Sequence, residues 1–467
     1  MRSKFQKVGL VFFGVVTGVL ISLNFSARAD KENSSTLPVE ELRSFADVFN
    51  AIKQGYVEPI EDKKLITYAI SGMLSNLDPH SAYLDADAFK DLQVSTQGEF
   101  GGLGIEVSME DGFVKVVAPI DDTPAFRAGV KAGDLIVKLD ETPVKGMTLS
   151  DAVKRMRGKP KTQITLTIAR KGEAKPLVLT LTREKIKVQS VKSKMVEPGF
   201  GYIRITQFQE ETTSDVVRAL DKLYKDKEAK DGLRGLVLDL RNDPGGLLHG
   251  AVGVSATFLP EKALVVSTDG RTEDAKRRFV ASPEDYQRGK GEDLLKNLPA
   301  AAKTVPMVVL VNGGSASASE IVAGALQDHK RAVVLGTQTF GKASVQTILP
   351  LSNQTAIKLT TARYYTPSGR SLQAKGITPD VIVEDTPGGA SHEMLREADL
   401  DRHLANDKEK DKPASPKAVP AKNGKGDSKG EGESEAKPAV FELASKNDYQ
   451  LNQAMGLLKA WRIIQQR

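Results

Sequence analysis

Three closely spaced serines follow a predicted strand and could supply a nucleophile. Ser315, Ser317 and Ser319 come after the apolar run Met307–Val311 and an Asn-Gly-Gly break. The run predicts a buried strand, and the helical periodicity after it places Ser317 at a predicted helix N-terminus. Unpaired N–H groups and the positive end of the helix dipole favour negative charge there. Ser317 is therefore a candidate nucleophile, while a helix cap among small residues is the ordinary structural explanation of such serines.

A lysine could serve as the base for this serine. Lys342 lies in a glycine-flanked turn after the predicted strand at residues 332–336. An amine with the ordinary lysine pKa is protonated at neutral pH, but burial among apolar residues lowers the pKa and gives a neutral base. The chain has five histidines, and none lies in a context that suits a base for serine; His329 belongs to a polar helix end. Lysine is therefore the better candidate, with a surface lysine in a loop as the ordinary alternative.

The segment that contains both residues resembles a known active site. Residues 315–346 include SASASEI, AGALQD and GTQTFGKASVQ, which are similar to the active-site segment of the carboxyl-terminal processing proteases, the tail-specific proteases of peptidase family S41. The resemblance implies a serine endopeptidase with Ser317 as nucleophile, Lys342 as general base and Gln346 orienting the lysine. A Ser–Lys pair is a variant of the Ser–His–Asp arrangement. Residues four apart in an extended strand are separated by roughly 13 Å between their Cα atoms. A bend or helical turn is therefore expected between Lys342 and Gln346.

Further site residues are predicted from their positions. Glu320, one turn beyond the serine, and Asp328 are candidate supporting acids, although Asp328 could equally serve the helix end. An oxyanion needs two N–H donors, and the amide of Ala318 is expected to be one of them. The second is expected from Gly245 or Gly246, for which a tight turn is the structural alternative.

Those two glycines end the stretch DLRNDPGG at residues 239–246. The stretch resembles the DLRNNPGG sequence of the family, with Asp243 in place of the second asparagine. The difference introduces an acidic residue near the predicted site.

Residues 97–185 resemble a PDZ domain. Short alternating strands surround one predicted helix, and the phrases TPAFRAG and AGDLI carry the resemblance. It implies a glycine-rich loop whose N–H groups bind the C-terminal carboxylate of a peptide, which then adds as a strand to the sheet. Arg157, at the end of the predicted helix, is a candidate for relaying PDZ occupancy to the active site. The loop residues are Gly102, Leu103, Gly104 and Ile105.

The chain is expected to be a multidomain α/β protein. Strands and helices alternate in the predicted protease core, which favours a largely parallel sheet, of the tail-specific or crotonase-like type by resemblance. A segment rich in Lys, Glu, Ala, Gly and Pro is predicted to be a disordered linker. The expected parts are a signal peptide at 1–29, a helical N-terminal region at 30–96, the PDZ domain at 97–185, the protease core at 186–385, the linker at 386–440 and a C-terminal helix at 441–467.

Two segments of this plan carry no predicted chemistry. The sequence 270–291 is a charged, polar insertion without a recognisable motif, and His80 lies in a break between helices, where it is interpreted as a turn or capping residue. The helical N-terminal region resembles the part of the family that often mediates assembly.

The N-terminus is typical of an export signal. A basic start is followed by the apolar run Val8–Leu23 and by Ala-Arg-Ala at residues 27–29. Cleavage after Ala29 would leave a periplasmic or otherwise exported protein, and an uncleaved inner-membrane anchor is the alternative. Residues 1–29 hold four basic and no acidic residues, so the rest of the chain has a net charge of +2 instead of +6. Nucleic-acid binding is therefore not indicated.

The sequence as a whole predicts an exported serine endopeptidase that recognises substrate C-termini through its PDZ domain. The expected partners are proteins or peptides with free, apolar C-termini, and a homo-oligomer or an adaptor protein. Membrane contact is expected only if the N-terminal segment is retained. No metal or nucleotide motif occurs, so no cofactor is expected. The alternatives are a catalytically inactive PDZ scaffold and a histidine-dependent esterase, which the missing G-x-S-x-G motif disfavours.

Overall fold

The structure is a computed structural model that describes residues 37–173, 175–289, 291–387, 394–409 and 443–465. The predicted signal peptide and most of the predicted linker therefore lie outside the described residues. The prediction of a disordered linker is wrong for residues 394–409, because they are ordered and Glu397 among them is buried in contact with His80. The chain divides into two compact units, residues 1–70 and 71–467, which are considered separately.

The first unit contains α2 (Val39–Gly55) and the start of α3 (Asp62–Ser75). Helix α2 carries an apolar stripe, but none of the residues of α2 is buried within the chain. Its exposed apolar side chains are Val39, Leu42, Phe45, Val48 and Ile52.

The centre of the second unit is a mainly parallel, six-stranded sheet. Its strand order is β10-β11-β12-β15-β16-β19, and only the edge pair β10–β11 is antiparallel. Every residue of β11, β12 and β15 is buried, as expected for strands covered on both faces. The strands are β10 (Val191–Glu197), β11 (Phe200–Ile205), β12 (Gly235–Asp239), β15 (Met307–Val311), β16 (Val333–Gly336) and β19 (Val381–Ile382).

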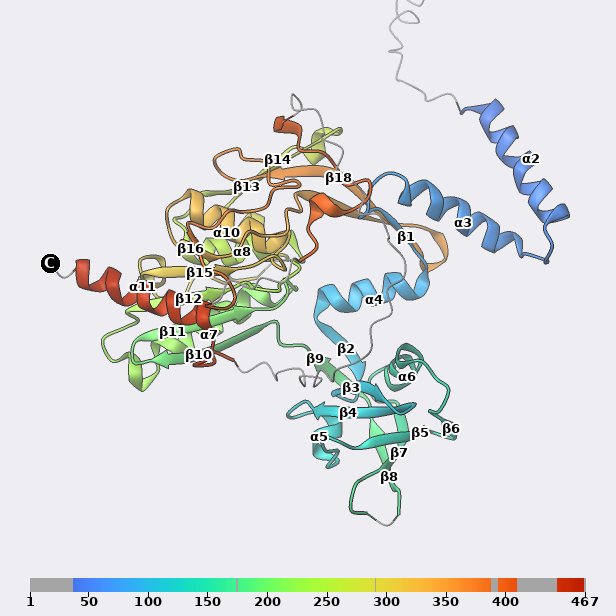
Figure 1. Cartoon of the computed structure of the whole chain (residues 1–467), viewed down its shortest axis with the longest axis horizontal. Helices are drawn as coiled ribbons and strands as arrows, with labels where there is room; N and C mark the ends of the chain where they lie inside the picture. Colours follow the sequence, from blue (N-terminus) through green and yellow to red (C-terminus); the bar gives the residue numbers. More distant parts are fainter. Residues whose placement is uncertain (1–36, 174, 290, 388–393, 410–442, 466–467) are drawn as a thin grey trace, which may run out of the picture. The chain divides into compact units, whose positions relative to one another are not determined.

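Helices cover both faces of this sheet (Figure 1). One face packs against α7 (Thr212–Tyr224), α8 (Leu248–Phe258) and α10 (Ala318–Asp328), whose apolar side chains form the main core. The C-terminal helix α11 (Tyr449–Gln465) packs on the opposite face through Leu451, Ala454 and Leu458. The predicted C-terminal helix therefore belongs to the protease core, where it covers the second face of the parallel sheet.

A second, antiparallel sheet carries the segment after Lys342. It consists of β1-β18-β13-β14, with β17 paired to β18. The insertion without a motif contributes β14 to this sheet, where it pairs with β13. The strands are β1 (Ala82–Leu84), β13 (Leu264–Gly270), β14 (Arg277–Val280), β17 (Ser344–Pro350) and β18 (Ala356–Tyr365), and the neighbouring helices are α4 (Ala86–Gln97) and α9 (Pro283–Tyr286).

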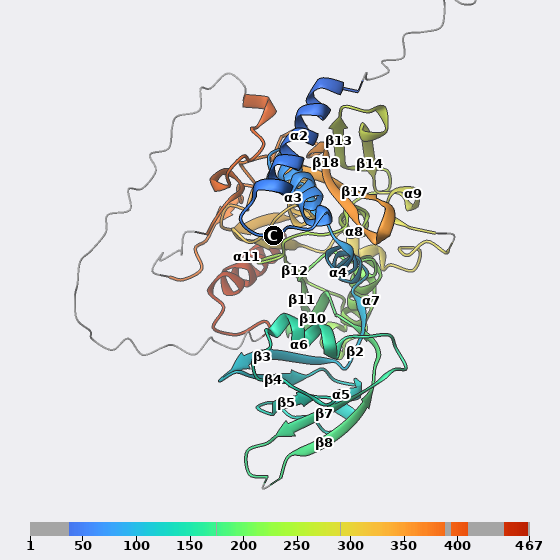
Figure 2. The same cartoon turned by 90° about the vertical axis from the view of Figure 1, so that its right-hand side faces the viewer.

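The PDZ region forms its own sheet and core. The strand order β3-β4-β5-β7-β8 leaves β3 at one edge of the sheet (Figure 2). β2 (Glu99–Gly102) pairs with β9 (Glu184–Lys187) beside this sheet. The other elements are β3 (Ile105–Glu110), β4 (Phe113–Pro119), α5 (Pro124–Arg127), β5 (Leu135–Leu139), β6 (Thr142–Pro143), α6 (Leu149–Met156), β7 (Gln163–Ala169) and β8 (Leu177–Thr182).

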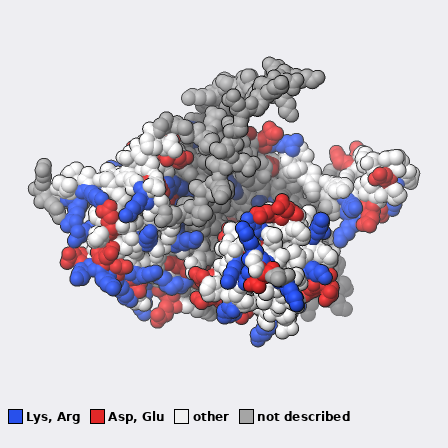
Figure 3. Space-filling view, turned by 60° about the horizontal axis from the view of Figure 1, so that its bottom comes forward, with Lys and Arg blue, Asp and Glu red and all other residues white. Residues whose placement is uncertain are grey.

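Short 3-10 helices complete the described structure. They span Lys227–Ala229, Glu273–Ala275, Ala300–Lys303, Ser352–Gln354, Glu397–Asp399 and Asp407–Glu409. On the face drawn in Figure 3, basic and acidic side chains are interspersed, in keeping with the nearly balanced charge. Within the part of the chain that the structure describes, none of the helices combines the length and the apolar character that a membrane span requires.

Candidate active site

Ser317 lies at the junction between β15 and α10, as the sequence predicts. Its φ of +56° places it in the left-handed region, which is uncommon for a residue with a side chain. The flanking serines are buried and bind the end of the neighbouring strand: Ser315 Oγ donates to the Leu240 carbonyl at 2.8 Å, and Ser319 Oγ donates to the Asp243 carbonyl at 3.0 Å. Of the three serines, Ser317 alone is partly exposed.

The buried carboxylate of Glu320 connects the serine to the turn that carries the lysine. Its Oε2 accepts hydrogen bonds from the Ser317 N–H at 2.8 Å and the Lys342 N–H at 3.0 Å. Its Oε1 accepts from the Thr339 hydroxyl at 2.6 Å and the Gly341 N–H at 2.8 Å. Burial raises the pKa of Glu320 to about 7, although these four donors oppose the shift. The predicted supporting acid thus contacts both candidate catalytic residues through their backbones.

The hydroxyl of Tyr364, in β18, makes a second connection. It contacts the carbonyl oxygens of Ser317, at 3.1 Å, and of Lys342. Tyr364 is almost completely buried, at 2% exposed. Among the described residues no hydrogen bond joins the two candidate side chains directly, so Glu320 and Tyr364 provide the link between their backbones.

Lys342 lies in the turn before β17 and is partly buried. Burial and the positive charge of Lys358 together lower its pKa to about 8, against the opposing effect of Glu397, Glu320 and Asp78. A substantial fraction of the amine is therefore neutral near pH 8, which is the state that a general base requires.

Gln346 lies within β17, just after an irregularity in the pairing with β18 between Val345 and Gln346. No helical turn follows Lys342 in the described part of the chain, and the pairing irregularity lies where a bulge can change the direction of side chains. The Gln346 amide donates to Ser344 Oγ at 2.9 Å and to Thr360 Oγ1 at 3.2 Å. It makes no hydrogen bond to Lys342 among the described residues.

Two residues near the site were not predicted from the sequence. Asp78 Oδ1 accepts from Thr360 Oγ1 at 3.1 Å, which extends the hydrogen bonds made by the Gln346 amide. The ring of His80 contacts the buried carboxylate of Glu397, with 2.8 Å between Nε2 and Oε2. Both belong to the break between helices that was interpreted as a turn, and Asp78 does accept the His80 N–H in such a turn.

The carboxylate that binds His80 also reaches the lysine turn. Glu397 Oε1 accepts from the amide of Gln373 at 2.9 Å, and Gln373 Oε1 accepts from the N–H of Ala343 at 3.0 Å. Because Ala343 directly follows Lys342, this chain of hydrogen bonds fixes the backbone beside the candidate base. No local sequence signal could indicate a contact between segments so distant along the chain.

The candidate oxyanion donors lie next to the serine. Gly245 has a φ of +96°, and a Cβ there would lie 2.8 Å from both the Ala318 nitrogen and the Ser317 Cβ. Only glycine permits this approach, which is a stronger requirement than a tight turn. The Gly245 N–H itself donates to Asp243 Oδ1 at 2.8 Å. For the N–H of Gly246, no acceptor is found among the described residues.

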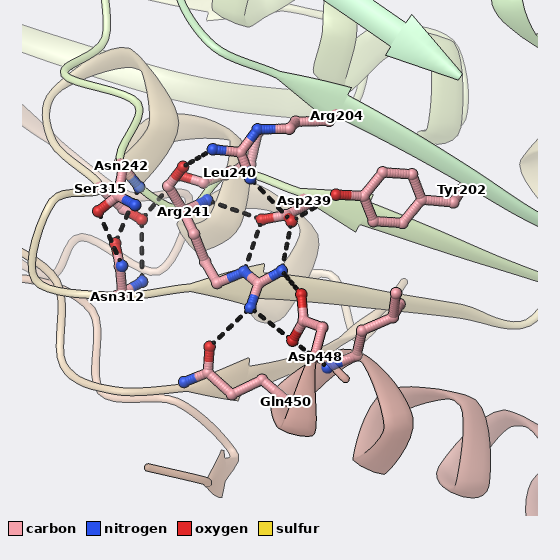
Figure 4. A network of polar contacts seen from close by, with 11 residues as sticks. Tyr202, Arg204, Asp239, Leu240, Arg241, Asn242, Asn312, Ser315, Asp448 and Gln450 are labelled. Atoms are coloured by element: carbon pink, nitrogen blue, oxygen red, sulfur yellow. Dashed lines mark hydrogen bonds and ion pairs between the residues drawn. The ribbon is translucent and has the colours of Figure 1, made fainter. Parts of the chain in front are cut away.

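A network of polar contacts supports the end of β12 before these glycines (Figure 4). The fully buried Asp239 accepts from Tyr202, Arg204 and Arg241, at 2.7, 3.0 and 2.6 Å from its Oδ2. Arg241 also binds Asp448 Oδ2 at 2.6 Å, next to the start of α11. The C-terminal helix is therefore attached close to the candidate oxyanion turn.

The structure does not bring Asp328 to the candidate site. It is the last residue of α10, about 16 Å along the helix from Ser317 at 1.5 Å per residue. Its carboxylate binds the Ser368 N–H and Arg370, which is the alternative helix-end role. The ring of His329 contacts the Leu264 carbonyl at 2.7 Å.

The PDZ loop lies between β2 and β3. The carbonyls of Leu103 and Gly104 accept the N–H groups of Ala125 and Ile120. Among the described residues, no acceptor is found for the N–H groups of Leu103 and Gly104 themselves. Arg157, at the end of α6, contacts Asp91 of α4 at 3.3 Å.

Comparisons with known proteins identify the family of the chain and the family of each of its parts. Family models match residues 199–383 (peptidase family S41), residues 101–181 (PDZ domain) and residues 19–88 (activating protease CtpB N-terminal domain). A carboxy-terminal-processing protease of Bartonella bacilliformis is 48% identical over 409 residues, which cover 86% of this chain and 89% of that protein. The chain belongs to peptidase family S41. The resemblance stated from the sequence is thus confirmed.

Other relatives of this S41 peptidase carry similar names. The carboxy-terminal processing protease CtpA of Bacillus subtilis is 35% identical over 337 residues, or 72% of this chain and 67% of that protein. A solved photosystem II D1 C-terminal processing protease is 31% identical, covers 73% of this chain and 92% of its own, and has a TM-score of 0.40. The family models and the two curated bacterial relatives support a peptidase with a PDZ domain and do not favour an inactive scaffold.

Proposed function

We propose that this S41 peptidase is an exported serine endopeptidase that cleaves peptide bonds with Ser317 as nucleophile and Lys342 as general base. The observation that carries the proposal is the shared carboxylate of Glu320, which accepts the backbone N–H groups of both residues. A lysine pKa near 8 and a helix N-terminus at the serine add to it.

In the proposed acylation step, the neutral amine of Lys342 accepts the hydroxyl proton of Ser317 while Oγ attacks the scissile carbonyl carbon. The oxygen that becomes negative is stabilised by N–H groups of Ala318 and the Gly245–Gly246 turn. The lysine then donates its proton to the leaving amine, the C–N bond breaks, and an acyl ester remains on the serine.

In the proposed deacylation step, Lys342 accepts a proton from water as the water oxygen attacks the ester carbonyl. The C–O bond to Ser317 breaks and the proton returns to the serine oxygen. The proposed role of Gln346 is to orient the amine, supported by its place in β17 two hydrogen bonds from Asp78. The amide would do so through Oε1, since its Nε2 donates to Ser344 and Thr360.

Substrate selection is proposed to begin at the PDZ loop. The edge position of β3 suits the addition of a peptide strand, and the N–H groups of Leu103 and Gly104 suit a carboxylate. Because Leu103 is buried and Ile105 is partly buried, an apolar last residue of the substrate is expected to bind best. Arg157 is proposed to relay occupancy of this loop through its contact with Asp91.

Export and assembly complete the proposal. Cleavage after Ala29 would release a protein that starts at Asp30, and N-terminal sequencing of the exported form tests this. A retained segment 8–23 would instead indicate a membrane-anchored protein. The exposed apolar face of α2 is proposed to take part in self-association, which light scattering of a Phe45→Glu variant would test.

The catalytic proposal is tested with purified protein, a peptide with a free apolar C-terminus, and mass spectrometry of the products. Ser317→Ala and Lys342→Arg should each reduce turnover by roughly 10³-fold or more, because the first removes the nucleophile and the second keeps the charge but cannot lose a proton. The matched control Lys227→Arg changes an exposed lysine and should retain wild-type turnover. Substantial cleavage by either site variant would refute the assigned role.

A further inference from the structure

A buried carboxyl group adjoins the turn that carries the proposed oxyanion donors. Asp243 follows β12, and its side chain is fully buried. Its Oδ1 accepts a hydrogen bond of 2.8 Å from the Gly245 N–H. Its Oδ2 is shielded from solvent and has no hydrogen-bond partner among the described residues. One carboxyl oxygen is therefore satisfied, while no hydrogen bond to the other is found among the described residues.

The charged groups around Asp243 do not compensate for this burial. Arg204, from β11, is the neighbouring cation, but its guanidinium binds Asp239 at 3.0 Å and the Arg241 carbonyl at 3.2 Å. Asp239, from β12, is a neighbouring anion and opposes ionisation. From α10, the hydroxyl of Ser319 donates to the Asp243 backbone carbonyl.

Burial is the main reason why the pKa of Asp243 rises to about 8, against the Gly245 N–H, the nearby Ser319 hydroxyl and Arg204, which lower it. At neutral pH the protonated form therefore predominates. A protonated carboxyl group offers one acceptor and one donor, as an asparagine amide does. The family pattern has asparagine at this position. Asp243 can therefore take the place of that asparagine as long as its carboxyl group keeps its proton.

The turn that Asp243 holds reaches the nucleophile. Gly245 lies directly against Ser317 and Ala318, since a Cβ on this glycine would be only 2.8 Å from atoms of both. Asp243 does not contact the scissile bond, so any effect on the reaction passes through the Gly245 backbone. It is a positioning residue.

We propose that Asp243 acts as a neutral carboxylic acid that positions the Gly245–Gly246 turn, and that release of its proton to water at alkaline pH displaces the turn and lowers peptidase activity. The activity part rests on the proposed function, whereas the protonation of Asp243 can be measured without catalysis.

The first test compares kcat/KM of the wild type and of Asp243→Asn at pH values from 6.5 to 9.5. Dividing the wild-type value by the variant value at each pH cancels the titration of Lys342, which both proteins share. With a pKa of about 8, the ratio should fall roughly tenfold between pH 7 and pH 9. Asp231→Asn changes an exposed aspartate, and the corresponding ratio should stay constant.

The second test measures thermal unfolding in the inactive Ser317→Ala background, with and without Asp243→Asn. Because the pKa of Asp243 is raised in the folded state from an ordinary 3.8, the folded protein binds more protons than the unfolded chain between about pH 4 and 8. Stability that depends on Asp243 therefore falls as pH rises through that window. The Tm of the variant should exceed that of its parent by an amount that grows from pH 5 to 8 and is constant above 8.5.

The outcomes separate the two proposals. If the Tm difference grows as described but the wild-type protein cleaves no peptide, the neutral acid is supported and the proposed function is refuted. A Tm difference independent of pH, an Asp243→Asn variant that does not fold, or an equal alkaline loss of activity in both proteins would overturn the inference about Asp243.

Discussion

Replacing Glu320 by glutamine tests the link between the two candidate catalytic residues most severely. At pH 8, above its pKa of about 7, the side chain is mainly ionised and accepts four hydrogen bonds. Glutamine keeps the shape of the Glu320 side chain but has an NH₂ group in place of one carboxylate oxygen. Because each oxygen accepts two hydrogen bonds, two of the four donors lose their acceptor. An unpaired buried donor costs about 1–3 kcal/mol, which gives roughly 2–6 kcal/mol for Glu320→Gln.

Such a loss is smaller than the stability of an ordinary domain, so the variant should still fold. For a core of this size it corresponds to a fall in Tm of roughly 4–24 °C. If the Ser317 and Lys342 backbones separate by about 1 Å, kcat/KM should fall by about 10²-fold. Both quantities are measured at pH 8, by differential scanning fluorimetry and by peptide cleavage.

Glu228→Gln provides the matched control, because it makes the same chemical change at an exposed position. It should leave both Tm and kcat/KM at their wild-type values. If Glu320→Gln melts within about 1 °C of the wild type and cleaves peptide within twofold of its rate, the carboxylate does not hold the site together, and the reasoning is refuted.

Three further results are expected. The kcat/KM of the wild type should rise with pH from 6.5 to about 8, because Lys342 is a base only after it loses its proton, and a flat profile would exclude that role. His80→Gln should lower kcat by about tenfold with KM unchanged, since Glu397 loses its partner and the lysine turn loosens; an unchanged kcat would show that this contact is only structural. Amidation of the substrate C-terminus should weaken binding to the loop around Gly104 by about tenfold or more, and equal kcat/KM for free and amidated peptides would exclude carboxylate recognition.

Local sequence signals were sufficient for the elements around the nucleophile. The apolar run Met307–Val311 is the strand β15, and the small-residue segment after it places Ser317 at the start of α10. The strand and the helix start are determined by apolar periodicity and by the glycines between them, which are signals that extend over only a few residues. The family resemblance then indicated Lys342 as the candidate partner of Ser317, which periodicity alone could not do.

The supporting contacts were not predictable in the same way. His80 meets Glu397, and Tyr364 meets Ser317, only because distant segments pack together. Their sequence neighbourhoods carry no sign of the partner. Asp328 shows the opposite case, since its proximity along the chain suggested a role at the site but the helix carries it to the far end.

The role of Gln346 depends on the path of the strand. An extended strand would carry it away from Lys342, and the pairing with β18 is irregular between Val345 and Gln346, where a bulge can change the direction of a side chain. A bulge of this kind has no dependable sequence signature. The position could therefore be named from the resemblance, but its geometry could not be derived.

The most direct test of the Ser317–Lys342 mechanism is to trap the acyl group. Wild-type protein is mixed with an activated ester of an apolar peptide, acid-quenched within the first turnover and digested, and the modified residue is located by mass spectrometry. The expected result is an acyl group on Ser317 in the wild type, formed faster at pH 8 than at pH 6.5, and none on Lys342→Arg. An acyl group on another side chain, or equal acylation of Lys342→Arg, would contradict the mechanism.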